Sequence, residues 1–212
     1  MLTDGYHRLM ALNGRTKLLA AAKIWAYPLW WSVMRSESAA AARVDVDWWA
    51  ECIDSEELLE LDRFSRFAFF SGALPEFRAL MHYRLRSAPL PLRLLMRALY
   101  RQPSHMVIDA GSIGPGLFIQ HGHGTLVGAK SIGSHCWINQ HVTIGYSDKG
   151  GNPTLCDNVR VAPGAVVIGP ITLHDGATVG PNAVVNRDVG PGETMVGALA
   201  RPFKRLVDDA PA

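Results

Sequence analysis

Between residues 107 and 189 an aliphatic residue recurs about every six positions along the chain. The thirteen positions all hold Leu, Ile or Val: Val107, Ile113, Ile119, Leu126, Ile132, Ile138, Ile144, Leu155, Val161, Val167, Leu173, Val179 and Val185. Strands have a side-chain period of about 2 and helices of about 3.6, so neither element produces this spacing. The spacing predicts hexapeptide repeats, stacked as about four triangular coils of a parallel β-helix.

The fourth position of many repeats holds a residue type that tolerates a left-handed backbone. These residues are Gly116, Gly122, Asn158, Gly164, Gly176, Asn182 and Asp188. Glycine reaches positive φ without steric cost, and Asn and Asp reach it more easily than other residues do. The corners of the expected coils should therefore lie at these positions.

The six-residue spacing breaks twice. From Ile119 to Leu126 the step is seven, and from Ile144 to Leu155 it is eleven, which leaves a loop at residues 146–154. Three histidines, His121, His123 and His141, lie close to these breaks. Because an interrupted repeat commonly marks a place where a functional loop is built, we expect the chemistry of the chain there.

Residues 1–104 lack the six-residue spacing and read as an α-helical N-terminal domain. We expect the β-helix at 105–200 and a C-terminal tail at 201–212. Residues 36–46 show no clear apolar face, so a linker is expected there.

The stretch 18–34 is the most apolar part of this domain, but Lys23 and Pro28 interrupt it and disfavour a membrane span. A packed helix or an oligomer contact is one interpretation. The other is a face that docks on a membrane surface or on a partner, since Trp residues suit both settings.

Charge and cysteine content narrow the function classes. The chain has 21 basic and 19 acidic residues, a net charge of +2, which argues against nucleic-acid binding. Its three cysteines show no metal-ligand spacing and are expected as buried thiols in the reducing cytoplasm. The histidines have no carboxylate or thiol partner at ligand spacing in the sequence, so no metal site is expected.

Three segments, residues 113–122, 137–145 and 196–201, resemble the serine acetyltransferase family. The helix predicted around residues 74–85 is similar to the one before the β-helix in the branch found with capsule and exopolysaccharide genes. The resemblance covers roughly residues 70 to 205. It implies a left-handed β-helix, a homotrimer with sites between neighbouring prisms, and direct transfer of acetyl from acetyl-CoA to a hydroxyl.

By this resemblance His121 falls on the catalytic histidine of the family. A neutral imidazole can take the proton of an acceptor hydroxyl near neutral pH, and such base catalysis contributes about 10²–10⁴-fold in rate. The alternative is a corner histidine whose ring only satisfies the backbone. The resemblance thus predicts His121 as the general base.

The sequence departs from the family pattern in three places. Met106 stands where the family has the Asp that orients the catalytic histidine, and Asp109 could replace that Asp only if the coil were shifted. Gln120 replaces the Asp before the histidine, and residues 151–153 replace the Arg-His-Pro that binds the serine carboxylate. Since a carboxylate without a cation lacks a charge-assisted partner, these losses favour a sugar acceptor in polysaccharide biosynthesis.

The remaining expected site residues follow from the same resemblance. For the acceptor they are Gln120, His123, His141 and Asn152. For CoA they are Gly145, Tyr146, Ala162, Pro163, Gly180, Pro181, Arg201 and Lys204. Two other functions stay open: a serine O-acetyltransferase of cysteine biosynthesis, and a trimeric scaffold without activity that docks through its Trp-rich N-terminus.

Overall fold

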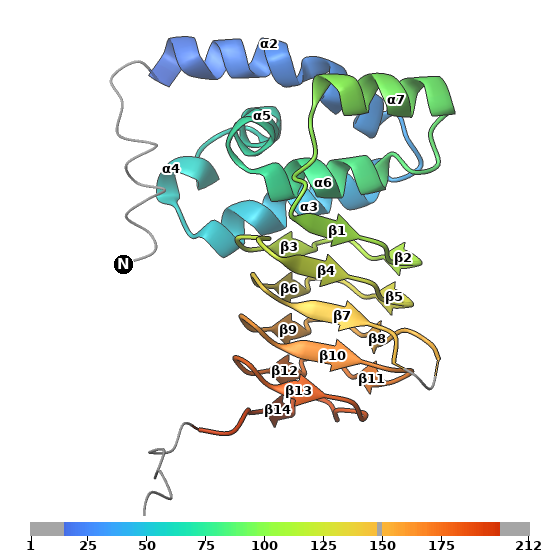
Figure 1. Ribbon diagram of the computed structural model, residues 1–212. Helices are drawn as coiled ribbons and strands as arrows, with labels where there is room; N and C mark the ends of the chain where they lie inside the picture. Colours follow the sequence, from blue (N-terminus) through green and yellow to red (C-terminus); the bar gives the residue numbers. More distant parts are fainter. Residues whose placement is uncertain (1–14, 148–149, 200–212) are drawn as a thin grey trace, which may run out of the picture.

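The computed structural model describes residues 15–147 and 150–199 of the chain. The helices precede all the strands and form a layer over one end of a three-sided prism (Figure 1). They are α2 (Arg15–Met34), α3 (Ala39–Ile53), α4 (Glu56–Leu59), α5 (Arg63–Ala73), α6 (Pro75–Arg84) and α7 (Leu90–Leu99). The change from helix to strand falls between Leu99 and Met106, close to the expected boundary.

The prism has three parallel sheets, one on each side. Sheet A contains β1 (Met106–Ile108), β4 (Thr125–Val127), β7 (Thr143–Gly145), β10 (Val166–Ile168) and β13 (Val184–Val185). Sheet B contains β2 (Ser112–Ile113), β5 (Ser131–Ile132), β8 (Thr154–Leu155) and β11 (Thr172–Leu173). Sheet C contains β3 (Phe118–Ile119), β6 (Trp137–Ile138), β9 (Arg160–Val161), β12 (Thr178–Val179) and β14 (Thr194–Met195). The expected fold class, a parallel β-helix after an α-helical region, is confirmed.

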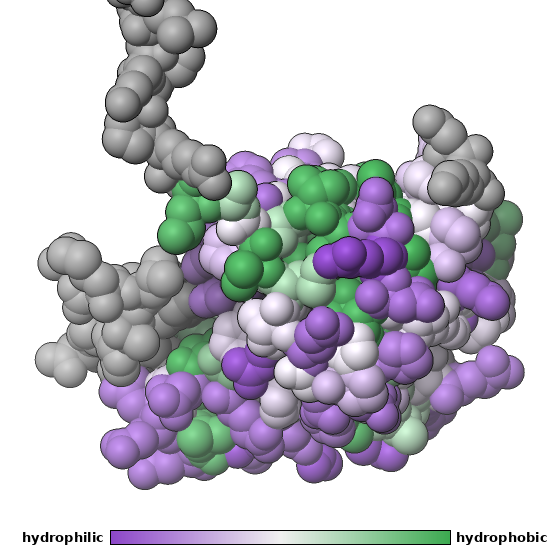
Figure 2. Space-filling view, turned by 90° about the horizontal axis from the view of Figure 1, so that it is seen from below, coloured by the Kyte–Doolittle hydropathy of each residue, from purple (hydrophilic) through white to green (hydrophobic). Residues whose placement is uncertain are grey.

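The stack has nearly five coils, one more than the expected number of about four. The fifth coil consists of β13, a single bridge between Val189 and Leu173, and β14. Its third side ends in Met195, where the run of Leu, Ile and Val has already stopped. Seen from the β14 end, the prism is a patchwork of hydrophobic and hydrophilic residues (Figure 2).

The aliphatic spacing was assigned one residue out of register at two positions in sheet A. Val107 is 50% exposed and Leu126 is 40% exposed, whereas Val127 is fully buried and pairs with Ile144. The step from Ile119 to the next inward residue is thus eight, not seven. A shift of one residue moves a strand's side chains to the opposite face, which is why Leu126 lies outside.

The corners agree with the expectation at five positions: Gly116, Asn158, Gly164, Gly176 and Asn182 all have positive φ. Gly122 and Asp188 do not. Three histidines take left-handed corners instead, His121 with φ 53°, His135 with φ 54° and His141 with φ 56°. A left-handed conformation costs a residue with a Cβ about 1–2 kcal/mol, so the surroundings must hold these rings in place.

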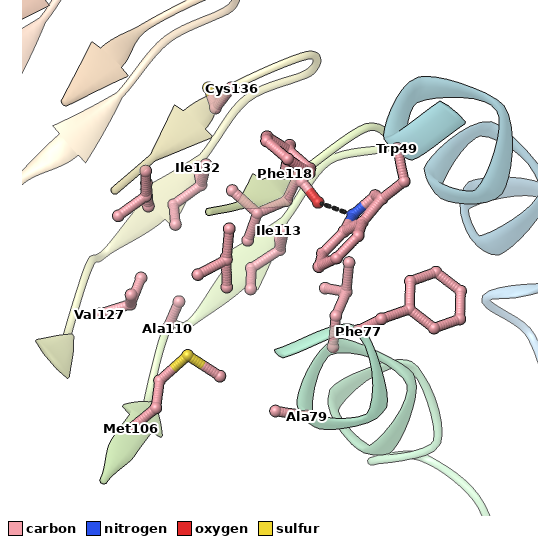
Figure 3. Packing of buried hydrophobic residues seen from close by; sticks show 14 of the residues in the cluster. Trp49, Phe77, Ala79, Met106, Ala110, Ile113, Phe118, Val127, Ile132 and Cys136 are labelled. Atoms are coloured by element: carbon pink, nitrogen blue, oxygen red, sulfur yellow. Dashed lines mark hydrogen bonds between the residues drawn. The ribbon is translucent and has the colours of Figure 1, made fainter. Parts of the chain in front are cut away.

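The helical layer is joined to the first coil by an aromatic cluster around Trp49 (Figure 3). The indole N–H of Trp49 donates to the carbonyl of Leu117 at 2.7 Å. Its ring meets the rings of Phe77 and Phe118 edge-on, at centroid distances of 5.1 and 4.9 Å. Helices α3 and α6 thus share one core with the top of the prism.

A buried ion pair closes the same junction. Arg84 Nε lies 2.7 Å from Asp45 Oδ2, and both side chains are almost fully buried. Asp45 also accepts from the amides of Gly116 at 2.8 Å and Leu117 at 3.3 Å. Arg84 donates to the carbonyl of Ile113 at 2.6 Å. Backbone groups at the top of the first coil therefore find partners in the helical layer.

Residues 36–46 do not form the expected linker, because most of them belong to α3. This helix begins with a run of alanines from Ala39, and alanine has the highest helix propensity of any residue type. Ala42, Asp45 and Val46 are buried on one side of this helix. Among the described residues, no helix combines the length and the apolar content needed to cross a bilayer.

Candidate active site

The chain turns from sheet C into sheet A in four successive coils, and these corners stack into one edge of the prism. We call it the C–A edge; it consists of residues 120–124, 139–142, 162–165 and 180–183. Backbone bonds link the corners: the amide of His141 donates to His123 at 2.8 Å, and the amide of Asn182 donates to Pro163 at 3.0 Å. Residues 18 or 19 positions apart thus lie one above the other.

His121 lies in the topmost corner of this edge, between β3 and β4. The corner is tight, since the amide of His123 donates to the carbonyl of His121 at 2.6 Å. The side chain is half-buried, and its Nε2 atom is screened from solvent. Gln120, beside it, accepts a hydrogen bond from Asn139 Nδ2 at 2.8 Å. The predicted base therefore sits in a corner fixed by backbone and neighbouring side chains.

Glu76 supplies this corner with a carboxylate that the sequence analysis missed. It extends from the first turn of α6 and is only 6% exposed, and Glu76 Oε1 accepts from the amide of Gly122 at 3.0 Å. A Cβ on Gly122 would lie 2.3 Å from the sulfur of Met106 and 2.9 Å from Cγ of Glu76. Glu76 and Met106 therefore meet at the backbone immediately after His121.

Asp109 does not take the place of the missing Asp. Met106 pairs with Thr125 in the strand register, so the first coil is not shifted, and Met106 keeps the position that ungapped counting gave it. Asp109 is exposed, and its backbone amide donates to Val127 at 2.9 Å. The carboxylate at this corner comes from α6, and its separation of 45 positions from His121 in the sequence hid it from motif analysis.

Glu76, His105 and His123 are the described residues that could hold a metal ion, with ligand atoms all within 4.8 Å of one another. The two imidazole rings are stacked, however, at 4.2 Å and only 12° from parallel. Parallel rings direct their lone pairs side by side, whereas zinc needs convergent ligands. Glu76 is also already an acceptor for Gly122. The geometry is that of a stacked pair, and the absence of a metal site stays a prediction.

His141 occupies the corner directly below. The imidazole of His141 lies against Gly124, where an added Cβ would be 2.7 Å from Nδ1. The ring is exposed, and so is that of His123. The structure thus brings His121, His123 and His141 together at the top of the C–A edge, whereas the second break, residues 146–154, lies at the other end of β7.

Comparison with known proteins decides the family. The profile described as bacterial transferase hexapeptide (six repeats) matches residues 152–187. A serine acetyltransferase of Helicobacter pylori is 39% identical over 141 residues, which is 62% of this chain and 82% of that protein. The chain belongs to the serine acetyltransferase family. A serine acetyltransferase of Synechococcus elongatus is 37% identical over 142 residues, and the chain spans 58% of its length.

Solved structures agree with this family. Serine acetyltransferase of Neisseria gonorrhoeae in complex with serine superposes with a TM-score of 0.60 at 21% identity, over 85% of this chain and 83% of that one. That likeness concerns the fold. The soybean serine acetyltransferase complexed with serine has a TM-score of 0.56 at 28% identity, over 77% of this chain and 68% of that one.

These relatives correct the expected acceptor. The prediction of a sugar acceptor in polysaccharide biosynthesis is wrong, because the relatives are serine acetyltransferases and the soybean enzyme is complexed with serine. Membership in the branch found with capsule and exopolysaccharide genes stays a prediction. The error came from treating one loop, residues 151–153, as the only source of a cation for a carboxylate. Membership confirms the expected enzyme class, an acyltransferase family that uses acetyl-CoA, and disfavours the inactive scaffold.

The residues expected to bind CoA fall on two different edges of the prism. Four of them follow β9 and β12 on the C–A edge: Ala162, Pro163, Gly180 and Pro181. Gly145 and Tyr146 lie at the other end of β7, where sheet A turns into sheet B, and Asn152 is in the loop there. Four residues of strand span about 13 Å, so one chain does not bring Tyr146 next to His141. Arg201 and Lys204 lie outside the described residues.

The cysteines offer no alternative nucleophile. Burial raises the pKa of Cys136 to about 12 and that of Cys52 to about 12. Burial also raises the pKa of Cys156. Because the thiolate is the reactive form, none of the three thiols is prepared to carry an acetyl group near neutral pH.

Proposed function

We propose that this chain is a serine O-acetyltransferase that transfers the acetyl group of acetyl-CoA to the hydroxyl of L-serine. The observation that carries the proposal is that His121, which the resemblance of residues 113–122 assigns to the family's histidine, occupies the irregular left-handed corner of the prism. The names of the relatives and the serine held by the soybean enzyme support the acceptor.

The proposed reaction is a direct transfer. His121 accepts the proton of the serine hydroxyl while the hydroxyl oxygen attacks the thioester carbonyl carbon. The C–S bond then breaks, and the CoA thiolate leaves and takes the proton back from the imidazolium. One C–O bond forms and one C–S bond breaks, with no acyl-enzyme between them. The three protonated, shielded thiols support a route without a cysteine intermediate.

Lys130 is a candidate for binding the serine carboxylate in place of the missing Arg and His. Its backbone amide donates to the carbonyl of Pro153 at 2.8 Å, so it adjoins the loop in which the family places those residues. Its side chain is exposed. A lysine ammonium can form a charge-assisted hydrogen bond with a carboxylate, although without the bidentate geometry of arginine.

The proposed assembly is a homotrimer with the site between neighbouring prisms. On one chain, His121 and the loop that adjoins Lys130 lie on different edges, separated by the width of sheet A. Packing the C–A edge of one prism against the other edge of its neighbour would bring these groups together. The same packing would gather the two sets of residues proposed for CoA. The reduced state of the cysteines supports a cytoplasmic location.

The test is an acceptor comparison with the purified full chain. CoA release from acetyl-CoA is followed with L-serine, with L-serine amide, which lacks the carboxylate, and with a hexose. We expect release with L-serine to exceed release with either of the others by at least about tenfold, because both lack the charged partner. Equal rates with all three, or no release above hydrolysis with L-serine, would contradict the proposal.

A further inference from the structure

The helical layer carries many exposed large apolar side chains on two of its helices, α2 and α7. We define the α2–α7 face by its exposed large apolar side chains: Leu18, Ile24, Trp25, Tyr27 and Trp31 of α2, with Leu90, Leu94, Leu95 and Leu99 of α7. These side chains are between 42% and 78% exposed. A patch of this kind on a folded domain marks a contact surface.

The two helices belong to one surface because they contact each other. The ring of Trp25 meets the ring of Tyr100 edge-on at 4.7 Å, and the hydroxyl of Tyr100 donates to the carbonyl of Trp25 at 2.5 Å. Farther along, Ser32 Oγ lies 3.7 Å from the sulfur of Met96. Figure 1 shows both helices at the end of the molecule opposite the last coil.

The two helices of this face carry basic side chains and no acidic ones, although Glu57 of α4 adjoins Leu18 and Trp25. Residues 15–36 contain four basic side chains and residues 77–108 contain six, and neither segment contains an Asp or Glu. Two of these cations are neutralised by acids from elsewhere, since Lys23 pairs with Asp62 at 3.2 Å and Arg84 pairs with Asp45. Arg35 stays beside the face, with its guanidinium 4.3 Å above the ring of Trp31.

A basic pocket adjoins the apolar side chains of α7. It has a volume of about 470 Å³, and Arg86, Arg93 and Arg97 line it. Asp109 is the one acid in its wall, and no ion pair joins it to Arg93 or Arg97 in the part of the chain that the structure describes. At 100° per residue, Arg93 and Arg97 lie side by side on the helix surface, next to Leu90 and Leu94. The cations therefore border the exposed leucines.

We propose that the α2–α7 face binds an anionic membrane surface. The exposed leucines and tryptophans would enter the interface between headgroups and acyl chains, and the arginine pocket would take the phosphate of an anionic lipid. Exposed leucines beside arginines, as on α7, are an arrangement that suits peripheral binding to such lipids. Since no described helix can cross a bilayer, the chain would lie on the surface rather than span it.

The charge also argues against a second copy of this chain as the occupant. In a two-fold contact the same patch meets itself, so the arginines of one face would lie opposite those of the other. Like charges placed together oppose such a contact. An anionic surface instead meets the cations with opposite charge.

The experiment is sedimentation of the full chain with vesicles of phosphatidylcholine alone or with a quarter of phosphatidylglycerol. We expect at least about tenfold tighter binding to the anionic vesicles, which rising salt weakens. Charge reversal in Arg93→Glu/Arg97→Glu should remove this preference, and Leu94→Ser/Leu95→Ser should weaken binding to both vesicle types. The matched controls are Arg187→Glu and Val184→Ser, exposed positions on the prism that should bind as the parent chain does.

Circular dichroism and acetyl transfer to L-serine check that each variant is folded, and light scattering reports its assembly. The proposal is overturned if neutral and anionic vesicles bind equally, or if the arginine variant binds as the parent does. It is also overturned if inorganic phosphate displaces the vesicles at an ionic strength at which chloride does not, which would make the pocket a site for a free anion. A smaller particle mass in the leucine variant, with unchanged vesicle binding, would assign the face to a second copy. None of these outcomes bears on the serine acceptor.

Discussion

Two corners of the C–A edge show what distinguishes the candidate site from the rest of the solenoid. The lower corner, residues 180–183, keeps the six-residue step and uses Asn182 for its left-handed turn. The upper corner, residues 120–124, has a step of eight residues and uses His121 for the left-handed turn. Its Gly122 amide donates to the carboxylate of Glu76 from α6. A repeat that suffices for folding below is thus altered above, and the alteration is stabilised from outside the solenoid. Two imidazoles, His121 and His123, lie in the altered corner, and a third, His141, lies in the regular corner directly below it.

The sharpest test of this contrast is His121→Ala. If the upper corner performs the base catalysis, we expect kcat with L-serine to fall by about 10²–10⁴-fold, with little change in the melting temperature. Asn158→Gly, a left-handed corner on another edge, serves as the control and should keep its activity. Equal loss in both variants would mean that corner geometry, not the imidazole, matters.

Removal of the outside support should have the next largest effect. Glu76→Ala leaves the amide of Gly122 without its acceptor, and an unsatisfied buried donor costs about 1–3 kcal/mol. We expect kcat/KM to fall by about 10- to 100-fold, since this distortion occurs next to His121. Glu76→Gln offers an oxygen at the same place and should recover most of the loss, with an unchanged pH profile. Failure of the glutamine to recover activity would assign the role to the charge instead.

A smaller effect is expected from the edge on the other side of sheet A. Lys130→Met should raise the KM for L-serine about tenfold, because a charge-assisted hydrogen bond to the carboxylate is lost. The KM for acetyl-CoA should not change. Lys130→Arg keeps a cation there and should fall between the two. Initial rates with each substrate varied in turn measure both constants, and a parallel rise in both would speak against the proposed contact.

The smallest effect concerns the irregular step itself. Val127 is fully buried and Leu126 is 40% exposed, so the two neighbours provide a matched pair. Val127→Ala should lower the free energy of unfolding by about 1.5–2 kcal/mol, whereas Leu126→Ala should change it by less than about 0.5 kcal/mol. Chemical denaturation measures both. If Leu126→Ala were the more destabilising of the two, Leu126 would be the inward residue, and the step from Ile119 would be seven residues.

The sequence predicted the prism because each coil repeats the same local rule, and thirteen aliphatic positions make that rule visible. The prediction failed where the spacing is irregular. Leu126 was expected inside the prism, but Val127 takes that place and Leu126 lies outside. At the last coil, Met195 stands where Leu, Ile or Val was expected. His121 could be predicted because the motif around it is contiguous. Glu76 could not, since only the packing of α6 on the first coil brings it to Gly122.

The helical region was less predictable for a related reason. Its core depends on pairings between distant residues, such as Trp49 with Leu117 and Asp45 with Arg84, which no local period encodes. The stretch 36–46 read as a linker because its alanines leave no apolar face, although alanine favours the helix that forms. The sugar acceptor was wrongly predicted because groups that could bind a carboxylate were sought only in the positions of known motifs.

The contact of Asp45 with the amides of Gly116 and Leu117 also protects the end of the solenoid against end-to-end aggregation. The first coil of any parallel solenoid has one rim of unpaired peptide groups, which could template end-to-end growth into fibres. In this chain α3 covers part of that rim with a carboxylate, and α6 braces the carboxylate with a guanidinium. A fragment beginning at the first strand would therefore expose unpaired peptide groups on its first coil and should aggregate. The helices and the solenoid should be expressed together.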